Sequence, residues 1–172
     1  MLFQYMAYAE IALGVVSLTA MGAQKVDDLC TNLLNNLDEV PDGPGNRGVF
    51  IENKAGANLG GNVEGIDHLD DGLAIQIKSR DLDSPEKLLR QIESDLDDLD
   101  GIEKRTLKGG TSGGTKVSIP PGSIRQKALI VAIPENRSNW ASSPILRSGL
   151  EKLARSTRTF VRIVPVRNWR GK

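Results

Sequence analysis

Alternation of apolar and polar side chains is clearest in one stretch near the middle of the chain. Two runs with the two-residue period of a strand, 63–69 and 73–78, flank an Asp-Asp-Gly turn, and an Asp-Gly pair between apolar runs is a strong hairpin signal. Successive side chains of a strand point to opposite faces, so the apolar and polar members of each run separate. The pattern therefore predicts a β-hairpin with Asp67, Gln76 and Lys78 on one side.

The remaining hydrophobic pattern predicts helices that alternate with strands. A helical period runs through 24–39, and a serine followed by a proline predicts two further helices, which begin at Ser84 and Ser143. The continuous apolar run 128–133 predicts a strand buried on both faces, and 159–166 predicts the last strand. This order of elements predicts an α/β or α+β fold with helices packed on a central sheet.

The helix after Ser84 combines an apolar stripe with a strongly acidic face. We interpret that face as solvated, with a docking surface for a basic partner as the alternative. Its acidic residues are Glu93, Asp95, Asp97, Asp98 and Asp100.

The N-terminal part of the chain differs in composition from the rest. Residues 1–23 are mostly apolar and Glu10 is their only charged residue, but they lack the basic start of a signal peptide and carry too many polar side chains for a bilayer helix. A proline- and glycine-rich stretch at 41–46 predicts a boundary. We therefore expect a helical segment over 1–44, interpreted as the remnant of an entry region, and a main domain over 45–172.

The formal net charge of zero hides an asymmetry. Residues 1–101 carry 7 basic and 19 acidic side chains, whereas residues 102–172 carry 15 and 3. This division favours a nucleic-acid surface, because basic residues continue to the last position, and the alternative is two halves that pair with each other. The candidate nucleic-acid contacts are Lys104, Arg105, Lys108 and Lys116. The one cysteine, Cys30, excludes an internal disulfide.

The polar side of the predicted hairpin has the groups that phosphodiester hydrolysis requires. A hard cation such as Mg²⁺ takes oxygen ligands from carboxylates, amides and water, and a neighbouring lysine stabilises charge that develops on the phosphate. Asp67, Gln76 and Lys78 supply these groups. The alternatives are a turn-stabilising Asp67 and a solvated Lys78, and the lone His68, on the opposite face, is interpreted as a packed residue.

These residues resemble the core of the PD-(D/E)XK nuclease superfamily, which has an acidic residue on one strand, (E/Q)-x-K on the next, and an upstream acid from a helix. Asp67, Gln76, Lys78 and Glu52 match those positions, although 47–54 around Glu52 reads as either strand or helix. The resemblance implies a restriction-endonuclease-like mixed sheet flanked by helices. It also implies a divalent metal, Mg²⁺, held by Asp67, Glu52 and Gln76, of which the amide is the weakest ligand.

A longer stretch, about 47–166, is similar to the tRNA-nuclease toxin domains at the C-termini of contact-dependent growth-inhibition exoproteins. The matching pieces are Arg47-Gly48, Glu52, Ile66-Asp67, Asp71-Gly72, Ile77-Lys78-Ser79, Asp81-Leu82 and the two late strands. The resemblance implies an endonuclease that cleaves tRNA in the cytoplasm of a target bacterium. It also implies a cognate immunity protein, delivery as the end of a large secreted or cell-surface protein, and no stable membrane association of the isolated domain.

Two alternatives stay open on the sequence. The same fold could cleave DNA, because phosphate contacts carry little information about the sugar. Alternatively, the amide at Gln76 in place of a carboxylate could mark a module that binds nucleic acid or protein without catalysis.

Overall fold

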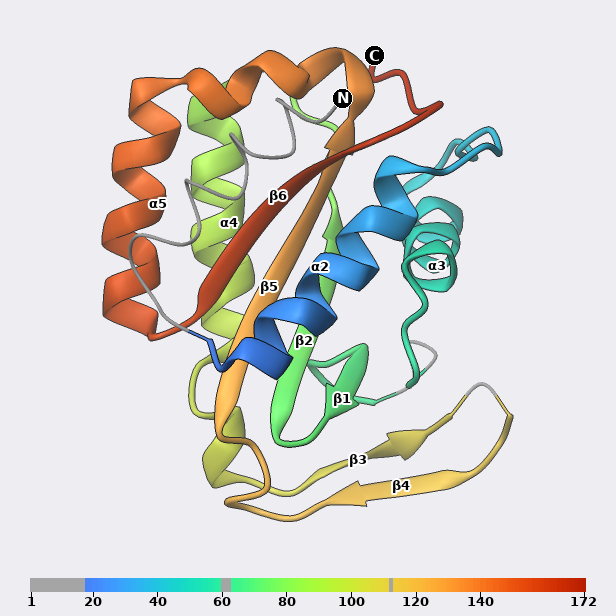
Figure 1. Ribbon diagram of the computed structural model, residues 1–172, viewed down its shortest axis with the longest axis vertical. Helices are drawn as coiled ribbons and strands as arrows, with labels where there is room; N and C mark the ends of the chain where they lie inside the picture. The colour runs from blue at the N-terminus through green and yellow to red at the C-terminus, as the bar shows by residue number, and fades with distance from the viewer. Residues whose placement is uncertain (1–17, 60–62, 112) are drawn as a thin grey trace.

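The computed structural model describes residues 18–59, 63–111 and 113–172, and its centre is a mixed four-stranded sheet (Figure 1). The strand order is β1-β2-β5-β6, with β1 antiparallel to β2 and the other neighbours parallel. The strands of this sheet are β1 (His68–Asp70), β2 (Leu73–Ser79), β5 (Gln126–Pro134) and β6 (Phe160–Val166). A separate hairpin consists of β3 (Leu107–Gly110) and β4 (Lys116–Ile119). The predicted α/β class is confirmed.

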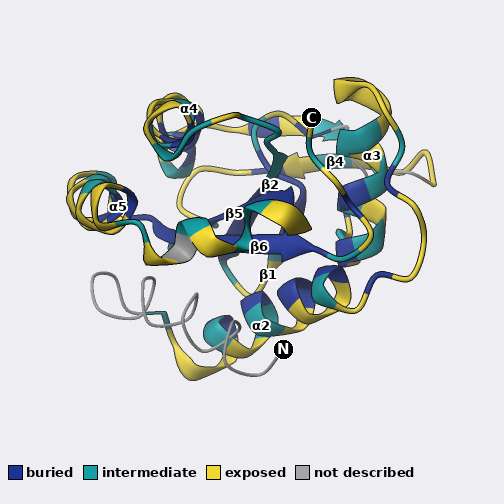
Figure 2. Cartoon of the chain, turned by 90° about the horizontal axis from the view of Figure 1, so that it is seen from above, coloured by how far each residue is buried: buried dark blue, intermediate teal, exposed yellow. Residues whose placement is uncertain are grey.

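Helices cover both faces of the sheet (Figure 2). Their bounds are α2 (Ala20–Leu34), α3 (Pro44–Ala55), α4 (Pro85–Leu99) and α5 (Pro144–Thr157), with short 3-10 segments η1 (Ile102–Lys104) and η2 (Glu135–Ser142). Helix α2 lies on one face, α4 and α5 lie on the other, and α3 stands beside the β2 side of the sheet (Figures 1 and 2).

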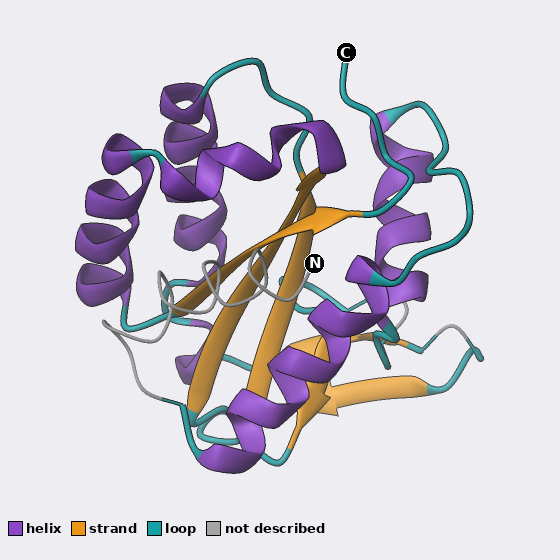
Figure 3. Ribbon diagram, turned by 45° about the horizontal axis from the view of Figure 1, so that its top comes forward, coloured by secondary structure: helices purple, strands orange, loops and turns teal. Residues whose placement is uncertain are grey.

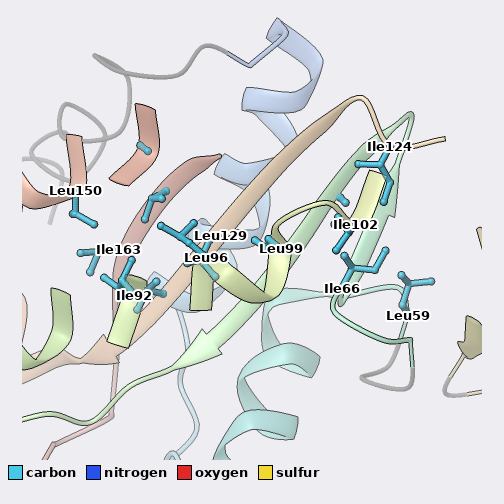
Figure 4. Close-up of a cluster of buried hydrophobic side chains, with 14 of the residues drawn as sticks. Leu59, Ile66, Ile92, Leu96, Leu99, Ile102, Ile124, Leu129, Leu150 and Ile163 are labelled. Atoms are coloured by element: carbon cyan, nitrogen blue, oxygen red, sulfur yellow. The ribbon is translucent and has the colours of Figure 1, made fainter. Parts of the chain in front are cut away.

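Two apolar clusters, one on each face, hold these layers together. Leu129 and Ile163 from the sheet pack with Ile92 and Leu96 of α4 in the first cluster (Figure 4). On the other face, the apolar members of β2 pack with α2 and α3. Strand β5 is buried throughout its apolar run, as predicted for a central strand.

The predicted hairpin forms, and its turn has the expected chemistry. Asp71 (φ 44°) and Gly72 (φ 79°) both adopt positive φ, as a two-residue hairpin turn of the type I′ class requires. The first strand is shorter than predicted, because Gly65 (φ 81°) turns the chain within 63–69 and the ladder is regular only from His68.

The ambiguous stretch 47–54 is helical. Helix α3 begins with Pro44 at its first position and ends at Gly56, which adopts the left-handed conformation (φ 91°). Helix α4 has the predicted cap, in which the Ser84 hydroxyl accepts a hydrogen bond from the Lys87 backbone N–H.

Helix α2 crosses one face of the sheet (Figure 3). It begins and ends earlier than the predicted 24–39, and its buried residues, which include Cys30, join the cluster formed by that face. Residues 1–17 lie outside the described part of the chain, so the division into 1–44 and 45–172 stays a prediction. Among residues 18–59, 63–111 and 113–172, no helix has the length and apolar character needed to cross a membrane.

Candidate active site

A cleft of about 860 Å³ opens between α3, the segment that leads into β1, and the C-terminal end of β2. The four residues predicted to be catalytic all line it: Glu52, Asp67, Gln76 and Lys78. Helix α3 supplies Glu52, β2 supplies Gln76 and Lys78, and Asp67 immediately precedes β1. Residues far apart in the sequence therefore meet at one opening.

Asp67 is fixed to β2 through both its backbone and its side chain. Its N–H donates to the Ile75 carbonyl (2.9 Å), and its Oδ2 accepts from the Ile77 N–H (2.6 Å). Asp67 lies just before the regular ladder, which starts with His68 opposite Ile75, and its two bonds hold it beside the residues that flank Gln76. Burial raises the pKa of the Asp67 carboxyl, while the Ile77 hydrogen bond and the charge of Lys78 act in the opposite direction.

Glu52 reaches the same cleft from α3 and is half-buried. Burial and the negative charge of Asp67 raise its pKa to about 7, and Lys78 partly offsets them. The negative charge of Asp67 thus opposes the ionisation of Glu52. A cation placed between them would relieve this repulsion.

Gln76 and Lys78 occupy alternate positions of β2 and both border the cleft. Gln76 is 4% exposed, and its Oε1 has no hydrogen-bond partner among the described residues. The Lys78 Nζ lies 3.9 Å from the Asp98 Oδ2 of α4 and remains partly exposed. A buried carbonyl oxygen without a donor is costly unless a ligand satisfies it.

This donor set fits a hard divalent cation. The described residues contain no group of three or more His, Cys, Asp and Glu side chains that could hold a metal. Mg²⁺, however, is usually bound through only one or two carboxylates together with water. Two mutually repelling carboxylates and the unpartnered Gln76 oxygen meet that requirement.

The predicted nucleic-acid contacts do not gather at the cleft. Lys108, on β3, lines it. The Arg105 Nη1 lies 3.2 Å from the Glu64 Oε1, and Glu64 also borders the cleft. Lys104 is exposed at the end of η1, and Lys116 lies on β4 opposite Gly110. Lys108 is therefore the predicted contact best placed to meet a substrate in the cleft.

Three residues overlooked in the sequence pattern contribute to the cleft or support it. Arg47 and Arg80 line it, and Asp95, interpreted above as part of a solvated face, is 2% exposed and paired with Arg80. Asp95 lies on the stripe of α4 that includes Ile92 and Leu99, so its helical spacing was the available signal. His68 is buried, as expected for a packed residue.

No curated protein sequence matches the chain. Among solved structures, a CdiA-CT/CdiI toxin and immunity complex from Yersinia pseudotuberculosis is similar, with 20% sequence identity and a TM-score of 0.43 over 65% of this chain and 90% of that chain. The family model for the CDI toxin restriction endonuclease-like domain matches residues 47–155, more than half of the chain. The match confirms the predicted restriction-endonuclease-like fold, and the chain belongs to the family of CDI toxin restriction endonuclease-like domains.

Proposed function

We propose that this domain is an endonuclease that hydrolyses phosphodiester bonds, with Glu52, Asp67, Gln76 and Lys78 as its active site. The observation that carries the proposal is their convergence on one cleft, where two carboxylates of raised pKa face a lysine and a buried, unpartnered amide oxygen. Perturbed acids of this kind in a cleft are characteristic of functional sites.

Asp67, Glu52 and Gln76 would hold a divalent metal, for which Mg²⁺ is our proposal. Restriction endonuclease-like domains usually use divalent metals, and such an ion activates a bound water and neutralises charge on the phosphate. Asp67 keeps a fixed orientation because the Ile77 N–H holds its Oδ2. Glu52 gives up its proton near neutral pH, and Lys78 adds a positive charge where the phosphate oxygens become more negative.

The finer proposal on substrate is RNA, and specifically tRNA, on the strength of the resemblance from Arg47 to the last strand. DNA is the alternative substrate of the same fold. The chemistry at the cleft is the same for both, because it acts on the phosphate. A direct assay on the two polymers therefore decides between them.

We further propose that the domain acts as a toxin in the cytoplasm of a target bacterium. It would arrive there as the C-terminal part of a secreted or cell-surface exoprotein. Membership in a family of CDI toxin domains supports this role. A nuclease of this kind would attack the nucleic acid of its own producer, so we propose a cognate immunity protein that binds and neutralises it.

The test uses the purified protein with tRNA and with plasmid DNA, each with Mg²⁺ and with EDTA. We expect Mg²⁺-dependent cleavage of tRNA and loss of cleavage in Asp67→Asn and Lys78→Met. A matched control is Lys152→Met, an exposed lysine that lies on α5 and does not line the cleft. Cleavage of plasmid alone would select the DNA alternative. Salt-sensitive binding of either polymer without cleavage, under any metal, would favour the non-catalytic module instead.

The partner proposal has a separate test. Co-expression with the product of a small gene directly downstream should protect host cells and yield a co-purifying complex. Free growth of cells that produce the intact domain alone would contradict both the toxicity and the need for an immunity protein.

A further inference from the structure

Two arginines border the cleft without a part in the proposed chemistry. Arg47 enters it from the first half of α3, and Arg80 enters it from the residue that follows β2. The backbone N–H of Arg80 donates to the Ala132 carbonyl (2.8 Å), so the β2–β5 pairing continues to this position. Arg80 therefore extends the alternating row that contains Gln76 and Lys78.

Arg80 is held from behind by a buried carboxylate. Its Nε donates to the Asp95 Oδ2 (3.0 Å), and its Nη2 pairs with the Asp95 Oδ1. Asp95 is 2% exposed, whereas the Arg80 side chain is 25% exposed and lines the cleft. The Gln91 amide also donates to the Asp95 Oδ1 (3.4 Å). The acid is thus fully engaged, while part of the arginine still borders solvent in the cleft.

Arg47 is held from behind by an aromatic ring. Its guanidinium carbon lies 5.1 Å from the centre of the Trp169 ring, and Trp169 is 4% exposed. The Arg47 Nε is buried and has no hydrogen-bond partner among the described residues. Stacking on a tryptophan orients a guanidinium without using its donors. The terminal Nη donors of the partly exposed Arg47 side chain, for which the described residues provide no hydrogen-bond acceptor, are therefore the ones that can meet a ligand at the edge of the cleft.

The arrangement of these two side chains points to an anionic ligand. Burial of an ion pair is weak evidence for stability on its own, because desolvation offsets the attraction. A guanidinium fixed on one side and open on the other is well suited to phosphate, whose geometry it matches with paired donors. Asp81 follows Arg80 in the chain and also lines the cleft. Its Oδ2 accepts a hydrogen bond from the Lys172 N–H (3.4 Å), so this carboxylate has a partner of its own.

We propose that Arg47 and Arg80 each bind a non-scissile phosphate of the polynucleotide backbone. Asp95 and Trp169 are then positioning residues that act through the two arginines. This inference rests on the proposed function, since it takes the ligand to be a polynucleotide. It adds two contacts that set the register of the strand relative to the four residues that carry the chemistry.

The experiment measures binding separately from cleavage. In a Lys78→Met background, the affinity for a short fluorescent oligonucleotide is measured over a series of salt concentrations. Each phosphate contact contributes about 0.7 to the slope of log affinity against log salt for a single strand, and about 0.9 for a B-form duplex. We expect Arg47→Ala and Arg80→Ala each to lower the slope by about that amount, and the double variant to lower it by about twice as much.

Further variants separate phosphate binding from a purely structural role. Arg80→Lys keeps the charge but not the paired contact with Asp95, so it should keep the salt slope and weaken binding. Arg155→Ala is the matched control, because Arg155 is exposed on α5, across the molecule from α3 (Figure 2). In active protein, the two alanine variants should raise KM more than they lower kcat.

The outcomes distinguish failure of the inference from failure of the proposed function. Variants that melt at lower temperature but keep the wild-type slope and KM would show that both arginines are structural, which overturns the inference alone. A parent protein that neither cleaves nor binds any polynucleotide at low salt would overturn the proposed function and this inference with it.

Discussion

Two regions beside β2 each bury a carboxylate, and they differ in how far neighbouring groups compensate its negative charge. Asp95, at 2% exposure, has both oxygens matched by the Arg80 guanidinium. Asp67, at 9% exposure, has one backbone donor, from Ile77, and a second carboxylate, Glu52, for a neighbour. Lys78 offsets only part of this cost, since the pKa of Asp67 is still raised.

The difference separates a structural acid from a functional one. A buried charge with a paired counter-ion contributes to the fold once it has formed. A buried charge that the chain compensates only in part lowers the stability of the fold, and a bound cation can remove this loss. We therefore assign Asp95 to the support of the cleft and Asp67 to its chemistry, and the following variants test that assignment.

The largest expected effect is on catalysis. Asp67→Asn should lower the cleavage rate by about 1000-fold, or about 4 kcal/mol, as for loss of an essential catalytic group. Stability should not fall, because the amide oxygen can still accept from the Ile77 N–H. Burial raises the folded-state pKa of Asp67, so ionisation destabilises the fold above the unfolded pKa, and a neutral side chain avoids that cost at pH 8. Rates and melting temperatures, measured on one preparation, check both expectations.

Asp95→Asn should show the opposite pattern. Loss of the charge leaves the largely buried Arg80 without its counter-ion, and we expect a cost of about 3 kcal/mol in the free energy of unfolding. Urea denaturation measures it. The double variant Arg80→Met with Asp95→Leu should cost less than Asp95→Asn alone, because neither charge is then left unpaired. If Asp95→Asn were no less stable than Asp67→Asn, the contrast between the two regions would be lost.

Local signals in the sequence were sufficient for much of this picture. The Asp-Gly turn predicted that Asp67 lies next to the strand that carries Gln76, because a two-residue hairpin fixes its own register. The apolar run of β5 identified the central strand, and the serine cap located the start of α4. These features depend on neighbours within a few residues, so the pattern along the chain contains them.

The parts that depend on distant contacts were not predictable in the same way. Asp95 has the helical spacing of the buried stripe, but an aspartate at that position is usually expected to face solvent. Its partner Arg80 lies outside α4, so the pattern within the helix does not show the ion pair. Arg47 depends on Trp169, at the other end of the chain. Glu52 lies in a short apolar stretch, 47–54, whose pattern fits both a strand and the first turn of a helix. The roles of all four predicted catalytic residues stay predictions, since the structure places them together but does not measure their activity.

The smallest expected effect, and the most specific, concerns Glu52. Its pKa rises from 4.5 to about 7 on folding, so the protonated form is favoured in the folded state. The stability that this provides is fully present below about pH 4.5 and is lost as the pH rises through about 7. Glu52→Gln stays neutral throughout. Without metal, it should therefore match the wild type near pH 4.5 and exceed it at pH 8.

Because Glu52 is only half-buried, solvent screening limits this gain to about 1 kcal/mol, or about 2–4 °C in melting temperature. Glu93→Gln, an exposed acid on α4, should give no such pH-dependent gain. Addition of Mg²⁺ at pH 8 should stabilise the wild type more than Glu52→Gln, and EDTA should reverse this, because a ligand stabilises only the form that binds it. A Glu52→Gln protein that melts below the wild type at pH 8 in EDTA would show that the carboxylate is compensated within the chain. The cleft would then resemble the Asp95 region, and the argument for a cation between Glu52 and Asp67 would fail.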